Sequence, residues 1–324
     1  MVEIPGPDDV LAAACRIAPY AVRTPLVESP QLGEKIGGRV FLKLEILQRT
    51  GSFKFRGALN RILMIPQDQR AAGVVAFSSG NHAQGVAAAA KLLAMPALIV
   101  MPSDAPRAKI EGTRAFGAEI VLYDRLKEDR EAIAARICAE RRATLVKPFD
   151  DPGIMAGQGT VGLEIAEDAA RLGAVLDTVL VPCSGGGLVS GVALGLRTAG
   201  LAAKAHSVEP ENYDGMRRSL AAGTRSSAPG GKQSIADALM APTPGEHVFA
   251  LAKNLLSPGL VVRDAELETA VAFAATRLKL LVEPGGAAAL AALLAGKAEG
   301  RNIALVLSGG NADFAAVAEI VGRS

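Results

Sequence analysis

Short apolar runs alternate along the chain with longer segments in which apolar residues recur at helical spacing. The runs are almost continuously apolar, which is typical of parallel strands that are covered on both faces of a sheet. They predict strands at residues 40–45, 74–77, 97–101, 119–123, 178–183, 204–209 and 303–308. Helices are predicted at residues 81–94, 127–142, 156–172 and 264–278. The alternation indicates an open, doubly wound α/β fold with mostly parallel sheets.

The predicted strands fall into two groups along the sequence. The four runs between residues 40 and 123 form one group, and the runs after residue 178 form the other. We therefore expect two lobes with a cleft between them. A linker-like stretch, AAGTRSSAPGGKQS at residues 221–234, predicts a surface loop or a lid.

Composition and charge exclude several classes of function. The 324 residues include 35 Lys and Arg against 33 Asp and Glu, and this net charge of +2 gives no field that would attract nucleic acid or an anionic membrane. The most apolar stretch, residues 87–102, is interrupted by Lys91 and Pro96 and is shorter than the ~20 apolar residues of a membrane span. Function must therefore come from local sites.

The three cysteines, Cys15, Cys138 and Cys183, are an odd number without metal-ligand spacing. This pattern argues against a disulfide framework and favours a reducing compartment. No basic region precedes an apolar run near the N-terminus, so the sequence predicts no secretory signal. We expect a cytoplasmic protein.

The first candidate site is LEILQRTGSFKFRGALNRI, residues 44–62. Ser52 is placed to cap the helix that follows, and Lys54 lies in its first turn between Phe53 and Phe55. Apolar neighbours and the positive end of the helix dipole both lower the pKa of such a lysine, toward the free amine that attacks carbonyl groups. On spacing alone, the more common arrangement is a lysine whose stem packs while its charge reaches water.

The second candidate is VVAFSSGNHAQGVAAAAKL, residues 74–92, where a strand leads directly into a helix. Hydroxyls, an amide and unpaired backbone N–H groups converge at Ser78–His82, which suits a small carboxylate. The alternative is structural: Asn81 only caps the helix, and His82 is a partly buried histidine with its hydrogen bonds satisfied.

The third candidate is TVLVPCSGGGLVSGVALGL, residues 178–196, in which Ser184–Gly187 joins a buried strand to a helix. Successive glycines allow backbone N–H groups to surround a phosphate. A dinucleotide fingerprint is the competing interpretation, because Glu209 follows Gly187 by 22 positions, where a ribose-binding acid would lie. The glycine spacing fits it imperfectly, since Ser190 stands where the last glycine belongs.

The fourth candidate is LSGGNAD, residues 307–313, which places Ser308 at a strand end facing a ligand crevice. Glu283 opens an Ala-rich helix in LVEPGGAAALAAL, where a carboxylate commonly serves only the helix dipole. Together the four sites offer an amine for a carbonyl, a carboxylate cradle, a phosphate cup and a polar partner for a ring atom. Pyridoxal phosphate bound to an amino acid needs all four.

Five motifs, TGSFKFRGA, SSGNHAQGVA, AGQGTVGLEI, SGGGLVSG and SGGN, occur in this order over most of the chain. They resemble the threonine and serine dehydratase family of pyridoxal-phosphate enzymes, which includes serine racemase and hydroxyaspartate dehydratases. The resemblance implies a fold type II architecture, like the tryptophan synthase β chain, with the cofactor in the cleft. It implies a large cofactor-binding domain, 1–68 and 152–324, a small substrate-binding domain, 69–151, and a homodimer.

The resemblance also assigns roles to residues. Lys54 would form the internal Schiff base and would share catalysis with Ser79. The sequence differs from the family at Ser184, where many relatives have a fourth glycine. The implied cofactor-binding residues are Phe53, Lys54, Asn81, Ser184, Gly185, Gly186, Gly187, Leu188, Glu283 and Ser308. The implied substrate-binding residues are Ser79, Gly80, Asn81 and His82.

A divalent metal is left open. Several relatives bind Mg²⁺ or Ca²⁺ through a glutamate, a backbone carbonyl and an aspartate in the segment that matches VEPENYDGM, residues 208–216. Glu209 fits the first ligand and Tyr213 could offer its carbonyl, but Gly215 stands where the aspartate belongs. Asp214 could substitute, and the alternative is a set of acids at a solvated helix start.

The resemblance implies an ammonia-lyase that converts a 3-hydroxy amino acid, such as threonine, serine or 3-hydroxyaspartate, to a 2-oxo acid and ammonia. Serine at position 308 is a poor proton donor to a pyridine nitrogen, which favours α-proton removal by Lys54 coupled to hydroxyl loss. The runner-up is a racemase that uses Ser79 as a second acid and base. A nicotinamide-dependent dehydrogenase and a non-catalytic binding relative are the alternatives from other classes.

Overall fold

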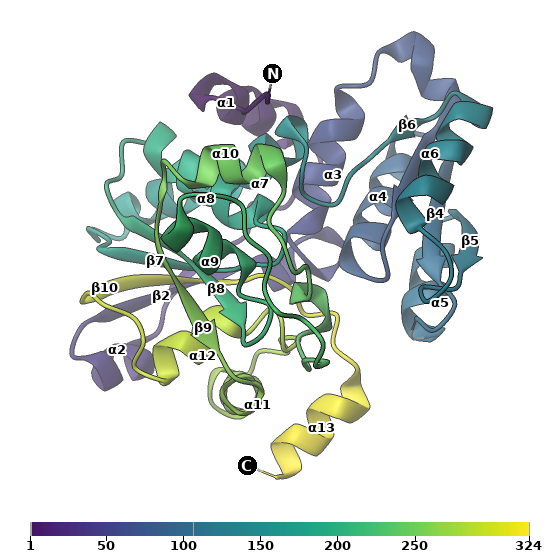
Figure 1. Cartoon of the computed structure of the whole chain (residues 1–324). Coiled ribbons are helices and arrows are strands. Elements are labelled where there is room, and N and C mark those ends of the chain that lie inside the picture. The colour runs from purple at the N-terminus through teal and green to yellow at the C-terminus, as the bar shows by residue number, and fades with distance from the viewer. Residues whose placement is uncertain (1, 106, 324) are drawn as a thin grey trace.

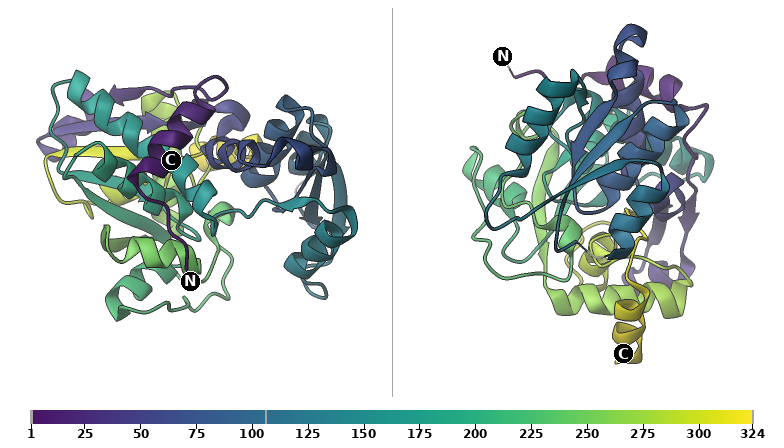
Figure 2. Two further views of the ribbon diagram at one scale, coloured as in Figure 1. Left: turned by 90° about the horizontal axis from the view of Figure 1, so that it is seen from above. Right: turned by 90° about the vertical axis from the view of Figure 1, so that its right-hand side faces the viewer.

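The structure is a computed structural model, and it describes residues 2–105 and 107–323. Two sheets form two lobes that lie side by side (Figure 1). We call the lobe with the six-stranded sheet the larger lobe and the lobe with the four-stranded sheet the smaller lobe. Figure 2 shows the smaller lobe standing apart at one end of the molecule when it is seen from above.

The sheet of the larger lobe has the strand order β1-β2-β10-β7-β8-β9. Its strands are β1 (Leu26–Glu28), β2 (Arg39–Leu44), β7 (Thr178–Pro182), β8 (Lys204–Pro210), β9 (Leu256–Val262) and β10 (Asn302–Leu307). Strand β1 runs antiparallel to β2, and every other neighbouring pair is parallel. The carboxyl ends of the parallel strands therefore share one edge, where α/β folds bind their ligands.

Helices cover both faces of this sheet, so the predicted doubly wound arrangement is confirmed. Ala304 and Val306 of β10 pack in one apolar core, and Ile303 and Leu305 pack in the other. Because alternate residues enter two different cores, the strand is apolar at every position. One face carries α1 (Pro7–Ile17), α7 (Pro152–Arg171), α8 (Gly187–Thr198) and α10 (Glu246–Ala252). The other face carries α2 (Pro30–Ile36), α11 (Asp264–Phe273), α12 (Ala288–Leu294) and α13 (Phe314–Gly322).

The smaller lobe has a fully parallel sheet in the order β5-β4-β3-β6. Its strands are β3 (Val74–Phe77), β4 (Ala97–Pro102), β5 (Glu119–Tyr123) and β6 (Thr144–Leu145). Its helices are α4 (Asn81–Leu92), α5 (Arg107–Ala115) and α6 (Arg130–Arg141). Helix α4 packs on one face of the sheet and α6 on the other.

The expected grouping of the strands is wrong at one strand. The run at 40–45 was grouped with the runs up to residue 123, but it forms β2, which pairs with β10 of the larger lobe in the register Val40↔Ile303. Its partner lies at the far end of the chain, so neighbouring position in sequence gave no guide to pairing. All seven predicted strands are present, and β1, β6 and β9 were missed.

The predicted helices differ from the observed ones mainly at their ends. Helix α7 begins at Pro152, earlier than predicted, because Asp151 caps it by accepting a hydrogen bond from the Ile154 N–H. Helix α6 begins at Arg130, where Asp129 serves as the cap. The segment predicted as one helix from 264 to 278 is α11 followed by a π-helical turn at Ala274–Leu278. Within the described residues, no helix is both long and apolar enough to cross a membrane.

Helix α3 (Lys54–Leu63) packs against both lobes. A Cβ atom on Gly157 of α7 would lie 2.7 Å from the Cα atom of Gly57, so only glycine allows α7 and α3 to approach this closely. On the other side, a Cβ on Gly85 of α4 would lie 3.2 Å from the backbone of Lys54. The turn that carries Lys54 therefore has backbone neighbours from both lobes.

A buried ion-pair network also ties α3 to the larger lobe. Arg56 donates to Glu45 after β2 at 2.8 Å and to Glu164 of α7 at 2.7 Å. Lys43 of β2 donates to the same Glu164 at 2.6 Å. The opposite charges raise the pKa of Arg56 further above its usual value, against the effect of burial, so the guanidinium stays charged. Removing one partner would leave a buried charge without compensation.

Candidate active site

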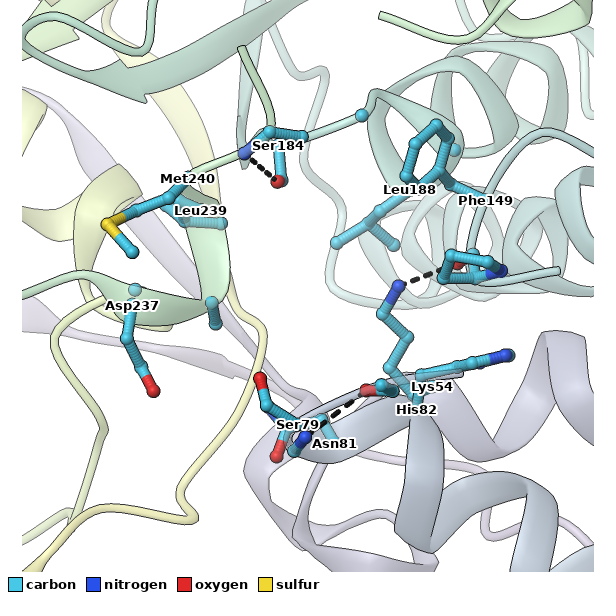
Figure 3. Close-up of a pocket in the computed structure, with 18 of the residues that line it drawn as sticks. Lys54, Ser79, Asn81, His82, Phe149, Ser184, Leu188, Asp237, Leu239 and Met240 are labelled. Atoms are coloured by element: carbon cyan, nitrogen blue, oxygen red, sulfur yellow. Dashed lines mark hydrogen bonds between the residues drawn. The ribbon is translucent and has the colours of Figure 1, made fainter. Parts of the chain in front are cut away.

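A cavity of about 370 Å³ lies between the lobes, and all the predicted cofactor-binding and substrate-binding residues line it. Figure 3 shows several of them. The larger lobe contributes the ends of β7 and β10, and the smaller lobe contributes the turn after β3. The lining residues that the sequence predicted are Phe53, Lys54, Ser79, Gly80, Asn81, His82, Ser184, Gly185, Gly186, Gly187, Leu188, Glu283 and Ser308. The structure thus brings together four motifs that are far apart in the chain.

Backbone hydrogen bonds place Lys54 next to the end of β10. Ser52 forms an isolated antiparallel bridge with Gly309, and the Phe53 N–H donates to the Ser308 carbonyl at 3.1 Å. The expectation that Ser52 caps α3 is wrong, because Phe53 occupies the N-cap position without a side-chain hydrogen bond. The bridge holds the Ser52 backbone extended and fixes the start of α3 instead.

The Lys54 side chain ends inside the cavity. Its ammonium donates to the Pro148 carbonyl at 2.7 Å and lies 5.2 Å from the centre of the Phe53 ring. Burial lowers the pKa of Lys54 to about 8. Near neutral pH, a much larger fraction of this lysine is therefore the free amine than of an exposed lysine.

Helix α4 directs its N-terminus at the cavity. Gly80 is its N-cap and lines the cavity with Asn81 and His82, so the first N–H groups of the helix are free to bind an anion there. The alternative that Asn81 caps this helix is wrong, since Asn81 is the first helical residue. The turn is held by a hydrogen bond from the Gly80 N–H to the Ser78 hydroxyl at 3.2 Å.

Asn81 is positioned by two side chains of the larger lobe. Its amide N–H donates to Glu283 Oε1 at 2.5 Å, and its Oδ1 accepts from Asn311 Nδ2 at 2.8 Å. Asn311 also donates to the Thr50 carbonyl at 2.7 Å. Sequence reasoning missed Asn311, although it is the last residue of the SGGN motif. These bonds join the carboxylate turn of one lobe to the strand end of the other.

Glu283 does not open a helix as predicted, because a turn follows it and α12 begins only at Ala288. Glu283 is 4% exposed, and burial raises the pKa of its carboxyl group above the usual value. The hydrogen bond from Asn81 opposes that rise. Glu283 thus serves the site as an acceptor for Asn81.

His82 is uncharged, and a hydrogen bond to the backbone holds its ring. Its Nε2 donates to the Val146 carbonyl at 2.9 Å, which requires the proton on that nitrogen. Burial, and then the nearby charge of Lys54, lower the pKa of His82 to about 3. The ring therefore adds no positive charge for a carboxylate, which agrees with the alternative of a satisfied histidine.

The glycine turn after β7 meets the cavity at the start of α8. Gly186 is the N-cap of α8 and has a φ of 91°, a left-handed conformation that favours glycine. Ser184 Oγ accepts a hydrogen bond from the Ala241 N–H at 3.2 Å, which ties the turn to a neighbouring loop. A Cβ on Gly185 would lie 2.5 Å from the ring of Phe149, so this ring packs directly against the turn.

Glu209 does not support the dinucleotide interpretation. It is fully buried, lies outside the cavity lining, and accepts hydrogen bonds from the N–H groups of Met216 at 2.7 Å and Arg217 at 2.8 Å. Burial raises the pKa of Glu209 to about 8. A carboxyl group that binds the start of helix α9 (Gly215–Ala222) in this way is not available to a ribose.

The residues at 208–216 also do not fit the metal site of the resembling enzymes. The carboxylate of Asp214 is bound by Arg217 and by Arg218. A Cβ on Gly215 would lie 2.3 Å from the Pro242 carbonyl oxygen, so an aspartate does not fit there. In the described part of the chain, no group of three His, Cys, Asp or Glu side chains could hold a metal ion.

Four charged residues of the cavity wall were missed. Lys109, Arg125 and Arg130 come from the smaller lobe, and Asp237 comes from a short 3-10 helix, Asp237–Leu239, of the larger lobe. None belongs to a motif, and their charges are ordinary for surface segments. Only the fold brings them to one cavity.

Comparison with known proteins identifies the family. The family model described as "Pyridoxal-phosphate dependent enzyme" matches residues 17–309, which is most of the chain. The chain belongs to this family. The predicted cofactor class and the predicted family are therefore confirmed.

Relatives of different activity resemble this pyridoxal-phosphate enzyme over nearly its whole length. An L-threo-3-hydroxyaspartate ammonia-lyase from Pseudomonas sp is 43% identical over 97% of each chain. An L-threonine ammonia-lyase from Thermotoga maritima is 39% identical over 98% of this chain and 78% of its own. The structure of maize serine racemase is 36% identical, with a TM-score of 0.92 over 99% of this chain and 98% of its own. The predicted fold type II architecture is confirmed.

Proposed function

We propose that the protein is a pyridoxal-phosphate-dependent ammonia-lyase that converts a 3-hydroxy amino acid to a 2-oxo acid and ammonia. One observation carries the proposal: the amine of Lys54, with its pKa lowered to about 8, shares a cavity with the N-terminus of α4 and the glycine turn. The names of two relatives, L-threo-3-hydroxyaspartate ammonia-lyase and L-threonine ammonia-lyase, support the same chemistry.

The lining residues fit the cofactor. Lys54 would link to its aldehyde, the backbone N–H groups of residues 184–188 would bind its phosphate, and Phe53 would pack beside its ring. Ser308 would bond the ring nitrogen, and Asn81, held by Glu283, would bond the ring hydroxyl. When bound, pyridoxal phosphate supplies an electron sink that makes the α-proton of an amino acid acidic.

The substrate carboxylate would bind at Ser79–His82, where the N-terminus of α4 offers backbone N–H groups. Lys54 would take the α-proton onto Nζ, since a low pKa leaves the amine free to accept it. The Pro148 carbonyl, 2.7 Å from Nζ, would then hold the ammonium in place. Overall, the β-hydroxyl leaves as one water molecule, and one water molecule is consumed when ammonia is released. The products are therefore a 2-oxo acid and ammonia.

Racemisation is the second candidate, because Ser79 lines the same cavity as Lys54 and could carry a proton on another face of the substrate. Two residues favour elimination. Ser308 presents a hydroxyl rather than a carboxylate and so does not keep a pyridine nitrogen protonated. Phe149 adds an apolar ring to the cavity wall beside the glycine turn, and such a ring offers no group that relays a proton.

The test uses the holoenzyme with L-serine, L-threonine and L-threo-3-hydroxyaspartate. We expect equal amounts of 2-oxo acid and ammonia from at least one of them. Lys54→Ala should lose turnover by orders of magnitude, together with the covalent link that borohydride reduces. Absence of 2-oxo acid from all three substrates would contradict the proposal.

The remaining expectations belong to the same proposal. We keep the homodimer, the cytoplasmic location and the domain boundaries, 1–68 with 152–324 and 69–151, as predictions. The sheet membership of the strands supports those boundaries, since β3 to β6 all lie between residues 74 and 145. Light scattering during gel filtration tests the dimer, and limited proteolysis near residues 68 and 151 tests the boundaries.

A further inference from the structure

Positive charge is concentrated on one wall of the cavity. Lys109 of α5, Arg125 of the turn before α6 and Arg130 of α6 all line the cavity from the smaller lobe. Arg125 pairs with Asp104 at 2.9 Å, and the Arg130 guanidinium lies 5.3 Å from the centre of the Phe77 ring. The α-carboxylate and the β-hydroxyl of serine or threonine require no such wall. Its charge suits a substrate that carries an additional negative group.

Lys109 lies next to the place where the substrate carboxylate is proposed to bind. Its Nζ lies 3.6 Å from the position that a Cβ on Gly80 would take, and Gly80 is the N-cap of α4. Two anion-binding groups, the N-terminus of α4 and the Lys109 ammonium, are therefore adjacent. Two carboxylates of one small molecule could use them together.

The partner of Lys109 comes from across the cavity. Asp237 Oδ2 accepts from Lys109 Nζ at 2.5 Å, and Figure 3 shows Asp237 beside Leu239 and Met240 on the wall of the larger lobe. The Lys109 side chain is 17% exposed and the Asp237 side chain is 49% exposed. A mostly buried ammonium needs an anion, whereas a half-exposed carboxylate is readily solvated when another anion replaces it.

We infer that Lys109 binds a side-chain carboxylate of the substrate, which takes the place of Asp237 in the ion pair, so that the enzyme prefers a dicarboxylic 3-hydroxy amino acid. This inference rests on the proposed function and names its substrate class. Arg130 on the same wall adds positive potential that attracts a dianion to the cavity, whereas the charge of Arg125 is balanced by Asp104. A monocarboxylic substrate leaves the pair between Lys109 and Asp237 intact and gains nothing from it.

The first test compares kcat/KM for L-threo-3-hydroxyaspartate and L-serine in the holoenzyme. The wild type should prefer hydroxyaspartate, and Lys109→Met should lower the ratio of the two kcat/KM values at least ~10-fold. Lys109→Arg should restore part of the ratio, because it keeps the positive charge. Arg114→Met is the matched control: it removes a cation from the same helix, in an exposed pair with Glu111 outside the cavity lining, and should leave the ratio unchanged.

The second test uses binding instead of turnover. Succinate, an unreactive dicarboxylate, should inhibit the holoenzyme competitively and more tightly than butyrate. Asp237→Asn, which removes the competing carboxylate, should tighten succinate inhibition several-fold, and Lys109→Met should abolish the advantage of succinate over butyrate. Equal inhibition by both acids in the wild type would overturn the inference.

The outcomes separate the inference from the proposed function. If Lys109→Met lowers kcat/KM equally for both substrates, Lys109 serves the α-carboxylate and the inference is wrong while the ammonia-lyase stands. The inference is also wrong if the wild type prefers serine or threonine. If no 3-hydroxy amino acid yields a 2-oxo acid, the proposed function itself fails.

Discussion

At the scale of single residues, Lys54 combines a charge-bearing group with an environment that disfavours charge. Its stem leaves a helix start that is fixed by backbone bonds to β10, and its amine ends in a cavity beside the Phe53 ring. Burial alone thus increases the fraction of Lys54 that is the nucleophilic free amine, because it lowers the pKa.

Reconstitution should report this pKa. The neutral amine attacks the cofactor aldehyde, so the rate at which apoprotein takes up pyridoxal phosphate should rise with pH, reach half of its maximum near pH 8 and level off about one pH unit higher. Growth of the visible absorbance band measures the rate. N-acetyl-lysine amide, measured with the same cofactor, is the control and should continue to rise toward pH ~10.4. A protein rate that followed the control would contradict the lowered pKa.

Ser79 gives a second prediction at this scale. Because the apolar Phe149 ring adds no proton-relaying group to the cavity wall, ammonia release from an L-3-hydroxy amino acid should exceed formation of its D form at least ~10-fold, a barrier difference of about 1.4 kcal/mol. Ser79→Ala should reduce activity on the D enantiomer far more than on the L enantiomer. A chiral assay with a 2-oxo acid assay decides this. Faster accumulation of the D product than of the 2-oxo acid would contradict the ammonia-lyase and favour the racemase.

At the scale of elements, the glycine turn depends on backbone shape. A Cβ on Gly186 would lie 2.5 Å from Met216 Cε, in addition to the cost of its φ of 91°. Gly186→Ala should therefore lower the Tm of the apoprotein and also weaken cofactor binding. Gly37→Ala is the control, since Gly37 has a φ of 66° but no atom within 4 Å of an added Cβ. It should cost about 1 kcal/mol and leave cofactor affinity unchanged.

Thermal denaturation and titration with pyridoxal phosphate measure both effects in the two variants. Unchanged cofactor affinity in Gly186→Ala would show that the turn is only structural. A loss of affinity in Gly37→Ala would show that strain alone, wherever it occurs, accounts for the effect.

All strands that are buried on both faces were predicted, together with the partly exposed β5. Strand β10 is apolar at each buried position because both cores need it, whereas β9 is partly exposed along most of its length and was missed. The four motifs identified the cavity because each combines a strand end with a helix start. Lys109 and Asp237 could not be found, since their function depends on a meeting across 128 positions of sequence. The pairing of β2 with β10 was not predicted for the same reason, because the two strands are far apart in the sequence.

At the scale of the whole molecule, the proposed cofactor residues come from both lobes. A ligand that contacts both should stabilise the whole chain, by about 2.7 kcal/mol at a concentration of 100 times Kd. Pyridoxal phosphate should therefore raise the Tm of the apoprotein by several degrees. Pyridoxine phosphate, which lacks the aldehyde, should raise it less, and Lys54→Ala should make the two ligands equivalent. No rise in Tm with pyridoxal phosphate would contradict a site shared by the lobes.

Helix α3 limits which substitutions this enzyme can accept during evolution. Its first turn touches α4 through Gly85 and its second touches α7 through Gly57 and Gly157, while Arg56 carries two buried ion pairs. A larger residue at Gly157 requires the backbones of α3 and α7 to move apart, and one at Gly85 presses on the backbone that carries the reactive amine. Substitution of cavity-wall side chains such as Lys109 can change the substrate preference without moving either lobe. Replacing one lobe by that of a related enzyme, in contrast, would require compensating substitutions in α3, because this helix packs against both lobes.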